Sequence, residues 1–185
     1  MKTLWLDCET TGLDPRKNAV VQVAMILEGP WGERTWQSNI APHPEAVIEE
    51  EALKISGRDL DAIRDYPNHR EVFAEFIGML GECVDKYDRG DKFYLRGYNS
   101  SFDWDFIHTW ARESGEKYLM SYMHWPPLCV AQAIANKHPN RWAGLKSRKL
   151  GALAAEFGVQ VHGELHDALT DVEVTRQLWR KVCCA

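Results

Sequence analysis

The chain has 185 residues, of which 45% are hydrophobic, and its formal net charge is −5 at neutral pH. This length and composition are typical of one globular domain with a substantial core, so we expect residues 1–185 to form a single domain. No apolar run is long enough to cross a bilayer and the chain enters an apolar segment almost at once, so we expect a cytoplasmic protein with no signal peptide and no membrane contact.

The hydrophobic pattern predicts an α/β protein. Apolar runs separated by Gly and Pro predict four strands, at residues 3–9, 19–28, 32–40 and 92–97. Helical periodicity predicts two short helices near 49–55 and 58–64 and longer helices over 70–86, 102–114, 128–137, 147–157 and 168–182. Three leading strands, a fourth after a helix and a helical C-terminal half predict a mixed central β-sheet flanked by α-helices.

Two acidic residues end the first predicted strand. Asp7 and Glu9 alternate with Cys8, so both carboxylates can project from one face of the sheet while Cys8 packs into the core on the other. Two acids beside a buried strand are costly without a counter-charge. Their position therefore indicates a cation site in preference to ordinary strand-end charges.

A third acidic residue, Asp103, lies near the start of a predicted helix, in the segment Asn99-x-x-Phe102-Asp103. Asp105 is two residues further on, and residues two apart on a helix point in different directions. We interpret Asp105 as a charge in the first helical turn, which the helix dipole favours, and take Asp103 as the functional carboxylate.

The last patch pairs a histidine with an acid. His166 stands five positions before Asp171, close to the start of the last predicted helix. The neighbouring His162 does not have this spacing, and we interpret it as an ordinary polar residue. Gly163 lies between the two histidines and is expected to allow mobility in this segment.

These residue types point to metal-dependent hydrolysis of a phosphodiester. Two carboxylates about 4 Å apart repel each other by roughly 4 kcal/mol at an effective dielectric constant of about 20, so four in one pocket need neutralising cations. Hard oxygen ligands select Mg²⁺ or Mn²⁺. Two such ions about 3.5–4 Å apart can stabilise the attacking and leaving oxygens of an in-line displacement, and a histidine beside them can move a proton.

The three motifs, in this order, resemble the DEDD family of 3′–5′ exonucleases, in the histidine subclass called DnaQ-like. The resemblance covers residues 3 to about 180 and is carried by Asp7-Cys8-Glu9-Thr10-Thr11-Gly12-Leu13, Asn99-x-x-Phe102-Asp103 and His166-x-Ala168-x-x-Asp171. It implies the ribonuclease H-like fold, in which the first motif lies on the central strand, the second near the start of a helix and the third at the start of the last helix.

The resemblance also implies a role for each of the five residues. Asp7 would bridge two divalent ions, Glu9 and Asp171 would hold the ion on the side of the nucleophile, and Asp103 would hold the second ion. His166 would take a proton from the attacking water. Asp167 departs from the basic residue common in this family, and we read it as a charge or cap at a helix N-terminus.

Substrate contacts are expected at two places. The family contacts the terminal nucleotide at positions that correspond to Thr10, Leu13, Asn99 and Phe102. Residues 126–155 contain no Asp or Glu and carry a local charge of +5, which leaves −10 on the remainder (−5 minus +5). We expect Arg141 and Lys146 in this stretch to contact backbone phosphates, with a solvated surface as the alternative.

We therefore predict a 3′–5′ exonuclease that uses two Mg²⁺ or Mn²⁺ ions to release nucleoside 5′-monophosphates from single-stranded 3′ ends. The Thr10-Thr11-Gly12 form favours DNA, and an oligoribonuclease or RNA-trimming enzyme is the alternative. A proofreading subunit docked to a polymerase belongs to another class; the absence of a tail in this sequence favours a free-standing nuclease. A catalytically inactive binding module is disfavoured by the complete set of five residues. The sequence does not predict the oligomeric state.

Overall fold

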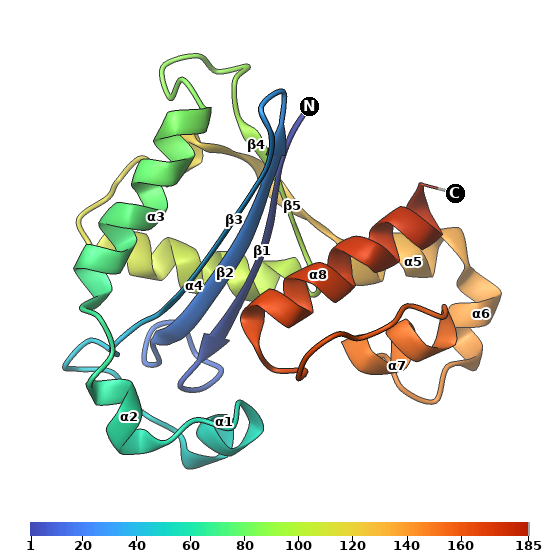
Figure 1. The fold of residues 1–185 in the computed structure, drawn as a ribbon, viewed down its shortest axis with the longest axis horizontal. Helices are drawn as coiled ribbons and strands as arrows, with labels where there is room; N and C mark the ends of the chain where they lie inside the picture. Colours follow the sequence, from blue (N-terminus) through green and yellow to red (C-terminus); the bar gives the residue numbers. More distant parts are fainter. Residues whose placement is uncertain (185) are drawn as a thin grey trace.

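The computed structural model describes residues 1–184, in which five strands form one mixed sheet with the order β3-β2-β1-β4-β5 (Figure 1). The first three strands, β1 (Lys2–Thr10), β2 (Val20–Gly29) and β3 (Gly32–Asn39), pair antiparallel. The strands β4 (Phe93–Gly97) and β5 (Met123–Cys129) add in parallel on the other side of β1. The predicted α/β class with a mixed central sheet is confirmed.

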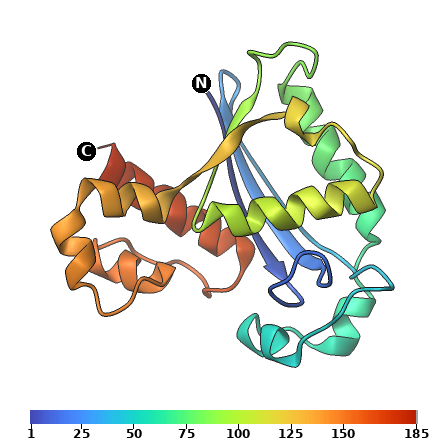
Figure 2. The same cartoon turned by 180° about the vertical axis from the view of Figure 1, so that it is seen from behind.

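Helices cover both faces of this sheet (Figures 1 and 2). One face packs against α3 (His69–Cys83) and α4 (Ser100–Glu113). The opposite face packs against α5 (Val130–Lys137), α7 (Leu150–Glu156) and α8 (Ala168–Leu178). The remaining elements are α1 (Glu50–Ile55), α2 (Leu60–Arg64), the short helix Leu119–Ser121, α6 (Pro139–Gly144) and a π-helical turn at Trp179–Cys183 that continues α8.

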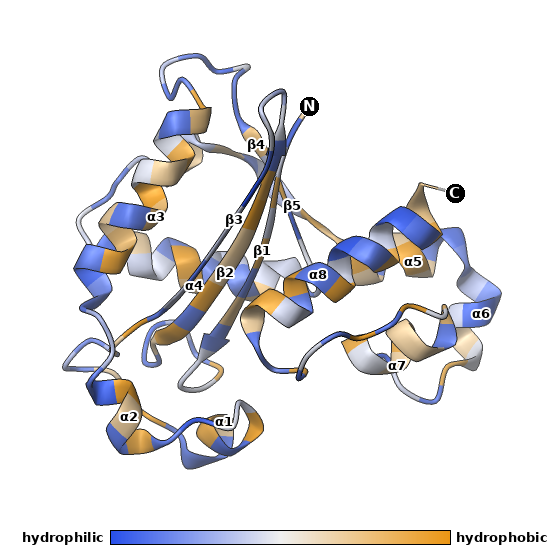
Figure 3. Ribbon diagram, in the orientation of Figure 1, coloured by the Kyte–Doolittle hydropathy of each residue, from blue (hydrophilic) through white to orange (hydrophobic). Residues whose placement is uncertain are grey.

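The neighbouring strands β1 and β2 are rich in apolar residues because both of their faces are covered (Figure 3). Side chains of β1 alternate between the two layers: Leu4 and Leu6 face α3 and α4, and Trp5 faces the layer of α8. The edge strand β3 is largely exposed and polar. Burial of β1 on both sides holds its C-terminal end, where Asp7 and Glu9 lie, in a fixed position.

One strand and two short helices, Leu119–Ser121 and α6, were not predicted. The strand β5 contains Pro126 and Pro127, which lack the N–H groups that a central strand needs, and it is accommodated because it lies at the sheet edge. The short helix α6 begins at a proline and was also missed. The helix α4 begins two residues before its predicted start, because Asn99 with φ 59° makes a sharp turn directly after β4.

The ends of several elements meet at one edge of the sheet. The tip of β1, the turn between β4 and α4 and the start of α8 lie together there, beside α1 and α2 (Figure 1). Gly97 at the end of β4 makes this approach feasible, since a Cβ atom at that position would lie 2.9 Å from the carbonyl oxygen of Leu6. Within residues 1–184, no helix combines the length and apolar character needed to cross a membrane.

Candidate active site

The predicted carboxylates converge at this edge. The ligand atoms of Glu9, His166 and Asp171 all lie within 4.8 Å of one another. The pKa of Asp7 is raised well above its ordinary range, first by burial and then by the negative charges of Asp103, Asp171 and Glu9. Asp7 therefore stands within electrostatic reach of all three other acids, and the first strand, α4 and α8 each contribute to one cluster.

Protonation is favoured throughout this cluster. Burial is the largest cause in each case, and it raises the pKa of Glu9 to about 7 and that of Asp103 to about 7. The pKa of Asp171 is also raised by burial, against the opposing effects of a backbone hydrogen bond from His166 and the His166 charge. Buried acids that repel each other in this way are stabilised by bound cations.

The donor set fits divalent metal ions. Asp7, Glu9, Asp103 and Asp171 offer carboxylate oxygens, the hard ligands that Mg²⁺ and Mn²⁺ prefer. Within residues 1–184, Asp171 Oδ1 is buried and makes no hydrogen bond. A buried carboxylate oxygen without a donor is costly on its own, so it is suited to accept a cation.

Asp103 is oriented by the first strand. One of its carboxylate oxygens, Oδ1, accepts a hydrogen bond from the Cys8 backbone N–H at 3.1 Å and another from the Cys8 thiol at 3.3 Å. Cys8 is buried in the core, as predicted, but its side chain also contacts this acid. Asp105 is exposed on the outside of α4, so the choice of Asp103 over Asp105 agrees with their positions.

His166 reaches the carboxylates from a segment with unusual backbone geometry. Its φ of 69° lies in the left-handed region, which is rare for residues other than glycine and is frequent at functional sites. Gly163 in the same segment has φ 117°. His162 lines a separate hollow with Gln177 and Lys181, away from the acids. Of the two histidines, only His166 belongs to the cluster.

Asp167 fixes the start of α8. Its Oδ1 accepts a hydrogen bond from the Thr170 backbone N–H at 3.2 Å, so it is the N-cap that the sequence suggested. Its other oxygen accepts hydrogen bonds from Gln22 at 3.2 Å and Gln37 at 3.0 Å, and the Gln22 side-chain oxygen accepts the Ala168 backbone N–H at 2.9 Å. This network ties the segment that carries His166 to β2 and β3.

The four positions expected to contact the terminal nucleotide differ in accessibility. Leu13 is 78% exposed, and Asn99 is exposed at the start of α4. Phe102 is half-buried and packs against Phe106 with ring centroids 4.9 Å apart. Thr10 is buried and donates a hydrogen bond to the Gly12 carbonyl at 2.6 Å. Leu13 and Asn99 are therefore available for contact, whereas Thr10 supports the turn.

The two basic residues expected to contact phosphates also differ. Arg141 donates to the Glu156 carboxylate at 2.7 Å and to the Glu156 carbonyl at 2.6 Å, and its guanidinium lies over the Phe157 ring. Lys146 is exposed in the loop before α7. The hydroxyl of Tyr98 donates to the Arg148 carbonyl, which holds this basic loop beside the turn that leads to Asp103.

A cleft beside the carboxylates contains a cation that no motif marks. Ser56, Gly57 and Arg58, from the turn between α1 and α2, line one side, and Leu165 and His166 line the other. The positive charge of Arg58 lowers the pKa of Glu9 and partly offsets the effect of burial.

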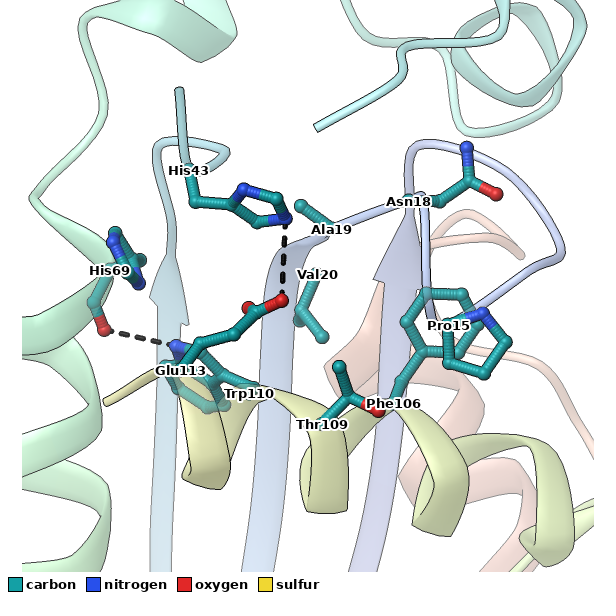
Figure 4. A pocket seen from close by; sticks show the side chains of 10 residues that line it. All are labelled: Pro15, Asn18, Ala19, Val20, His43, His69, Phe106, Thr109, Trp110 and Glu113. Atoms are coloured by element: carbon teal, nitrogen blue, oxygen red, sulfur yellow. Dashed lines mark hydrogen bonds and ion pairs between the residues drawn. The ribbon is translucent and has the colours of Figure 1, made fainter. Parts of the chain in front are cut away.

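The side chains around a second hollow, drawn in Figure 4, make structural contacts. Its lining includes His43, His69 and Glu113, and it has room for no more than about one water molecule. His43 Nε2 lies 3.5 Å from a carboxylate oxygen of Glu113, and the His69 carbonyl accepts the indole N–H of Trp110 at 3.0 Å. These contacts hold the loop after β3 and the start of α3 against α4, and none of the four clustered acids takes part.

Comparison with known proteins gives relatives over almost the whole chain. A DNA polymerase III of the PolC type from Thermotoga maritima is 23% identical over 176 residues, which are 94% of this chain and 11% of that polymerase. A ribonuclease T from Baumannia cicadellinicola is 27% identical over 120 residues, covering 61% of this chain and 55% of that protein. The chain thus spans about a tenth of the length of the polymerase it matches.

Solved structures show the same fold. Exonuclease I of E. coli, in complex with a dT13 oligonucleotide, superposes with a TM-score of 0.75 at 20% identity, over 98% of this chain and 41% of that one. This agreement confirms the predicted ribonuclease H-like fold. The sequence model of the exonuclease (RNase T) family matches residues 4–178, so the chain belongs to the exonuclease family.

Proposed function

We propose that this protein is a metal-dependent 3′–5′ exonuclease that acts on single-stranded nucleic acid. The observation that carries the proposal is the convergence of Glu9, His166 and Asp171 within 4.8 Å, with the pKa values of Asp7 and Asp103 raised first by burial and then by neighbouring acids. Family membership over residues 4–178 supports it. In this proposal residues 1–185 act as one exonuclease domain of the histidine subclass.

Two Mg²⁺ or Mn²⁺ ions are the proposed cofactors, held by Asp7, Glu9, Asp103 and Asp171. When bound, they lower the pKa of water and stabilise the charge that develops on the phosphate oxygens. The residues of the chain hold and orient the reactants. Asp7 is the proposed ligand of both ions, which is supported by the effect of the other three carboxylates on its pKa, second only to that of burial.

His166 is the proposed general base. It lies beside Glu9 and Asp171 and is exposed, so its ring can approach a water molecule at the phosphate. It takes the proton of the attacking water, the P–O bond to the 3′ oxygen of the preceding nucleotide breaks, and a nucleoside 5′-monophosphate leaves. Leu13 and Phe102 are proposed to flank the terminal base, and Asn99 to contact the same nucleotide.

The proposed substrate is single-stranded DNA, with RNA as the alternative. The fold is shared with an exonuclease I that was solved with a dT13 oligonucleotide, whereas ribonuclease T, by its name, acts on RNA. Matches to polymerases of the PolC type support a second candidate role, proofreading in association with a polymerase. Along the strand, Lys146 is proposed to face backbone phosphates, whereas Arg141 pairs with Glu156.

The test uses strands of equal sequence. The purified protein is incubated with single-stranded DNA and RNA, each labelled at the 3′ or the 5′ end, with Mg²⁺ or Mn²⁺. The proposal predicts early release of the 3′ label as a mononucleotide and a ladder of shortening 5′-labelled products. A buffer with EDTA and the Asp7→Ala variant serve as controls. Internal cleavage, 5′ polarity or full activity in EDTA would contradict the proposal.

A further inference from the structure

The cleft beside Glu9 and His166 contains an arginine that forms no close ion pair with a carboxylate in the part of the chain that the structure describes. Arg58 lies in the four-residue segment between α1 and α2 and is half-buried. Among the residues that the structure describes, ten other basic side chains lie within 4.0 Å of a carboxylate oxygen, whereas the Arg58 guanidinium does not. Its Nη1 donates to the Ser56 carbonyl at 3.1 Å, which leaves the remaining guanidinium donors available.

The position of Arg58 is fixed by the segment around it. Its backbone N–H donates to the Leu53 carbonyl at 2.9 Å, and Leu53 and Ile63 pack onto Val21 of β2. At the other end of α1, the Glu49 backbone N–H donates to the Thr11 carbonyl at 2.8 Å, two residues after Glu9. The arginine is therefore held by the same strands that position the acids.

The surroundings favour an anionic ligand for this arginine. Arg58 shares the cleft with His166, and its charge acts on Glu9. Lys54 on the same side adds a second cation, although it lies 3.8 Å from Glu50. Two acids also line the cleft: Glu164, which is exposed, and Asp167, whose carboxylate already accepts hydrogen bonds from Gln22, Gln37 and Thr170. A planar guanidinium with several free donors matches the geometry of phosphate oxygens.

We propose that Arg58 binds a non-bridging oxygen of the scissile phosphate, on the side where Glu9 and His166 lie. This inference rests on the proposed function, because it places that phosphate at the carboxylate cluster. After hydrolysis the same oxygen belongs to the 5′-phosphate of the released mononucleotide. Arg58 therefore stabilises negative charge on the phosphate during the reaction and also holds the product.

The first test measures binding of the product and needs no turnover. Titration calorimetry with thymidine 5′-monophosphate and with thymidine, both in Mn²⁺, is compared for the wild type, Arg58→Ala and Arg58→Lys. We expect Arg58→Ala to weaken monophosphate binding about 10- to 100-fold, the range of a hydrogen bond to a charged group, and to leave thymidine binding unchanged. Arg58→Lys keeps the positive charge but not the planar set of donors, so its affinity for the monophosphate should lie between those of the wild type and Arg58→Ala.

The matched control is Arg64→Ala. Arg64 is an exposed arginine on the neighbouring helix α2, paired with Asp61 at 3.7 Å, and its replacement should leave both ligands unaffected. Mn²⁺ binding separates a direct role from damage to the acids. Loss of a positive charge beside Glu9 should leave Mn²⁺ affinity unchanged or increase it, whereas a distorted carboxylate cluster would weaken it.

Kinetics then distinguish this inference from the proposed function. If the wild type degrades single strands, Arg58→Ala should lower kcat about 10- to 100-fold while its circular dichroism spectrum stays that of the wild type. Equal monophosphate affinity in wild type and Arg58→Ala, or no monophosphate binding by the wild type, would overturn the role of Arg58. Arg58-dependent monophosphate binding without hydrolysis of any strand would overturn the proposed function and leave only the phosphate contact of Arg58 standing.

Discussion

Cys8 and Asp103, which are 95 residues apart in the chain, are joined by two hydrogen bonds to one carboxylate oxygen. The backbone N–H of Cys8 is available because β4 pairs with β1 only as far as Trp5. The thiol adds a second donor from the core side. The strand that carries Asp7 and Glu9 thus also orients the acid that α4 supplies.

The thiol of Cys8 is expected to support activity by positioning Asp103. Cys8→Ala removes one of two donors to a charged group, which costs about 1.5–3 kcal/mol, so kcat should fall roughly 10- to 100-fold. Cys8→Ser keeps a donor and should retain more activity. Cys83→Ala replaces another buried cysteine and is the control. Equal activity of Cys8→Ala and Cys83→Ala in a single-strand degradation assay would contradict this role.

Each of the four acids should be required for hydrolysis. Asp7→Ala, Glu9→Ala, Asp103→Ala and Asp171→Ala each remove an oxygen ligand from a shared cluster, so each should nearly abolish turnover. Mn²⁺ should raise the melting temperature of the wild type by mass action and should do so less in each variant. Asp105→Ala, on the exposed side of α4, should behave as the wild type in both measurements.

The two histidines should differ sharply. His166→Ala should lose about 10²- to 10⁴-fold in kcat, the usual effect of removing a general base, and should still bind single strands. His162→Ala should stay near the wild type because His162 lines a separate hollow. A pH–rate profile gives a further measurement: the limb that reports the base should be absent in His166→Ala. A variant of His162 with the larger loss would show that the assignment of the third motif is wrong.

The stability of the metal-free protein should depend on pH. Burial raises the pKa of Glu9 from 4.5 to about 7 and that of Asp103 from 3.8 to about 7, so the folded state binds more protons than the unfolded state between about pH 4 and pH 7. The free energy of unfolding therefore falls as the pH rises through this range, by about 3 kcal/mol for Glu9 alone.

Urea denaturation in EDTA at pH 5 and pH 8 measures this effect. The protein should be less stable at pH 8, and excess Mn²⁺ should restore stability there more than at pH 5, because metal binding displaces protons from the acids. The variant Glu9→Gln should show a smaller dependence on pH. Stability in EDTA that rises from pH 5 to pH 8 would contradict the assigned protonation of the cluster.

Two basic residues of the stretch 126–155 should have different roles. Lys146→Ala should weaken binding of long single strands and reduce the salt slope by roughly 0.7, the amount expected for one lost phosphate contact, with little change for a dinucleotide. Arg141→Ala should instead lower stability by about 0.5–1 kcal/mol, since Arg141 pairs with Glu156. Unchanged strand binding in both variants would identify the stretch as a solvated surface.

The sequence alone was sufficient for the fold class and for four of the five strands, and it singled out five residues that the structure brings together near the end of β1. Alternation along β1 predicts that Asp7 and Glu9 share a face, because side chains on a strand alternate with a period of two. The spacing of His166 and Asp171 distinguishes His166 from His162, since it matches a family pattern. Asp167 could be recognised as a helix cap because capping depends on neighbouring residues.

Contacts between distant segments were decided only by the tertiary structure. The hydrogen bonds from Cys8 to Asp103, the place of Arg58 beside Glu9 and the pairing of Arg141 with Glu156 follow no local periodicity. The strand β5 could not be predicted from its own residues, because prolines are tolerated in a strand only at a sheet edge. Which strand lies at the edge depends on the whole fold. Local sequence carries the chemistry of each side chain, whereas packing of the sheet against its helices determines which side chains meet.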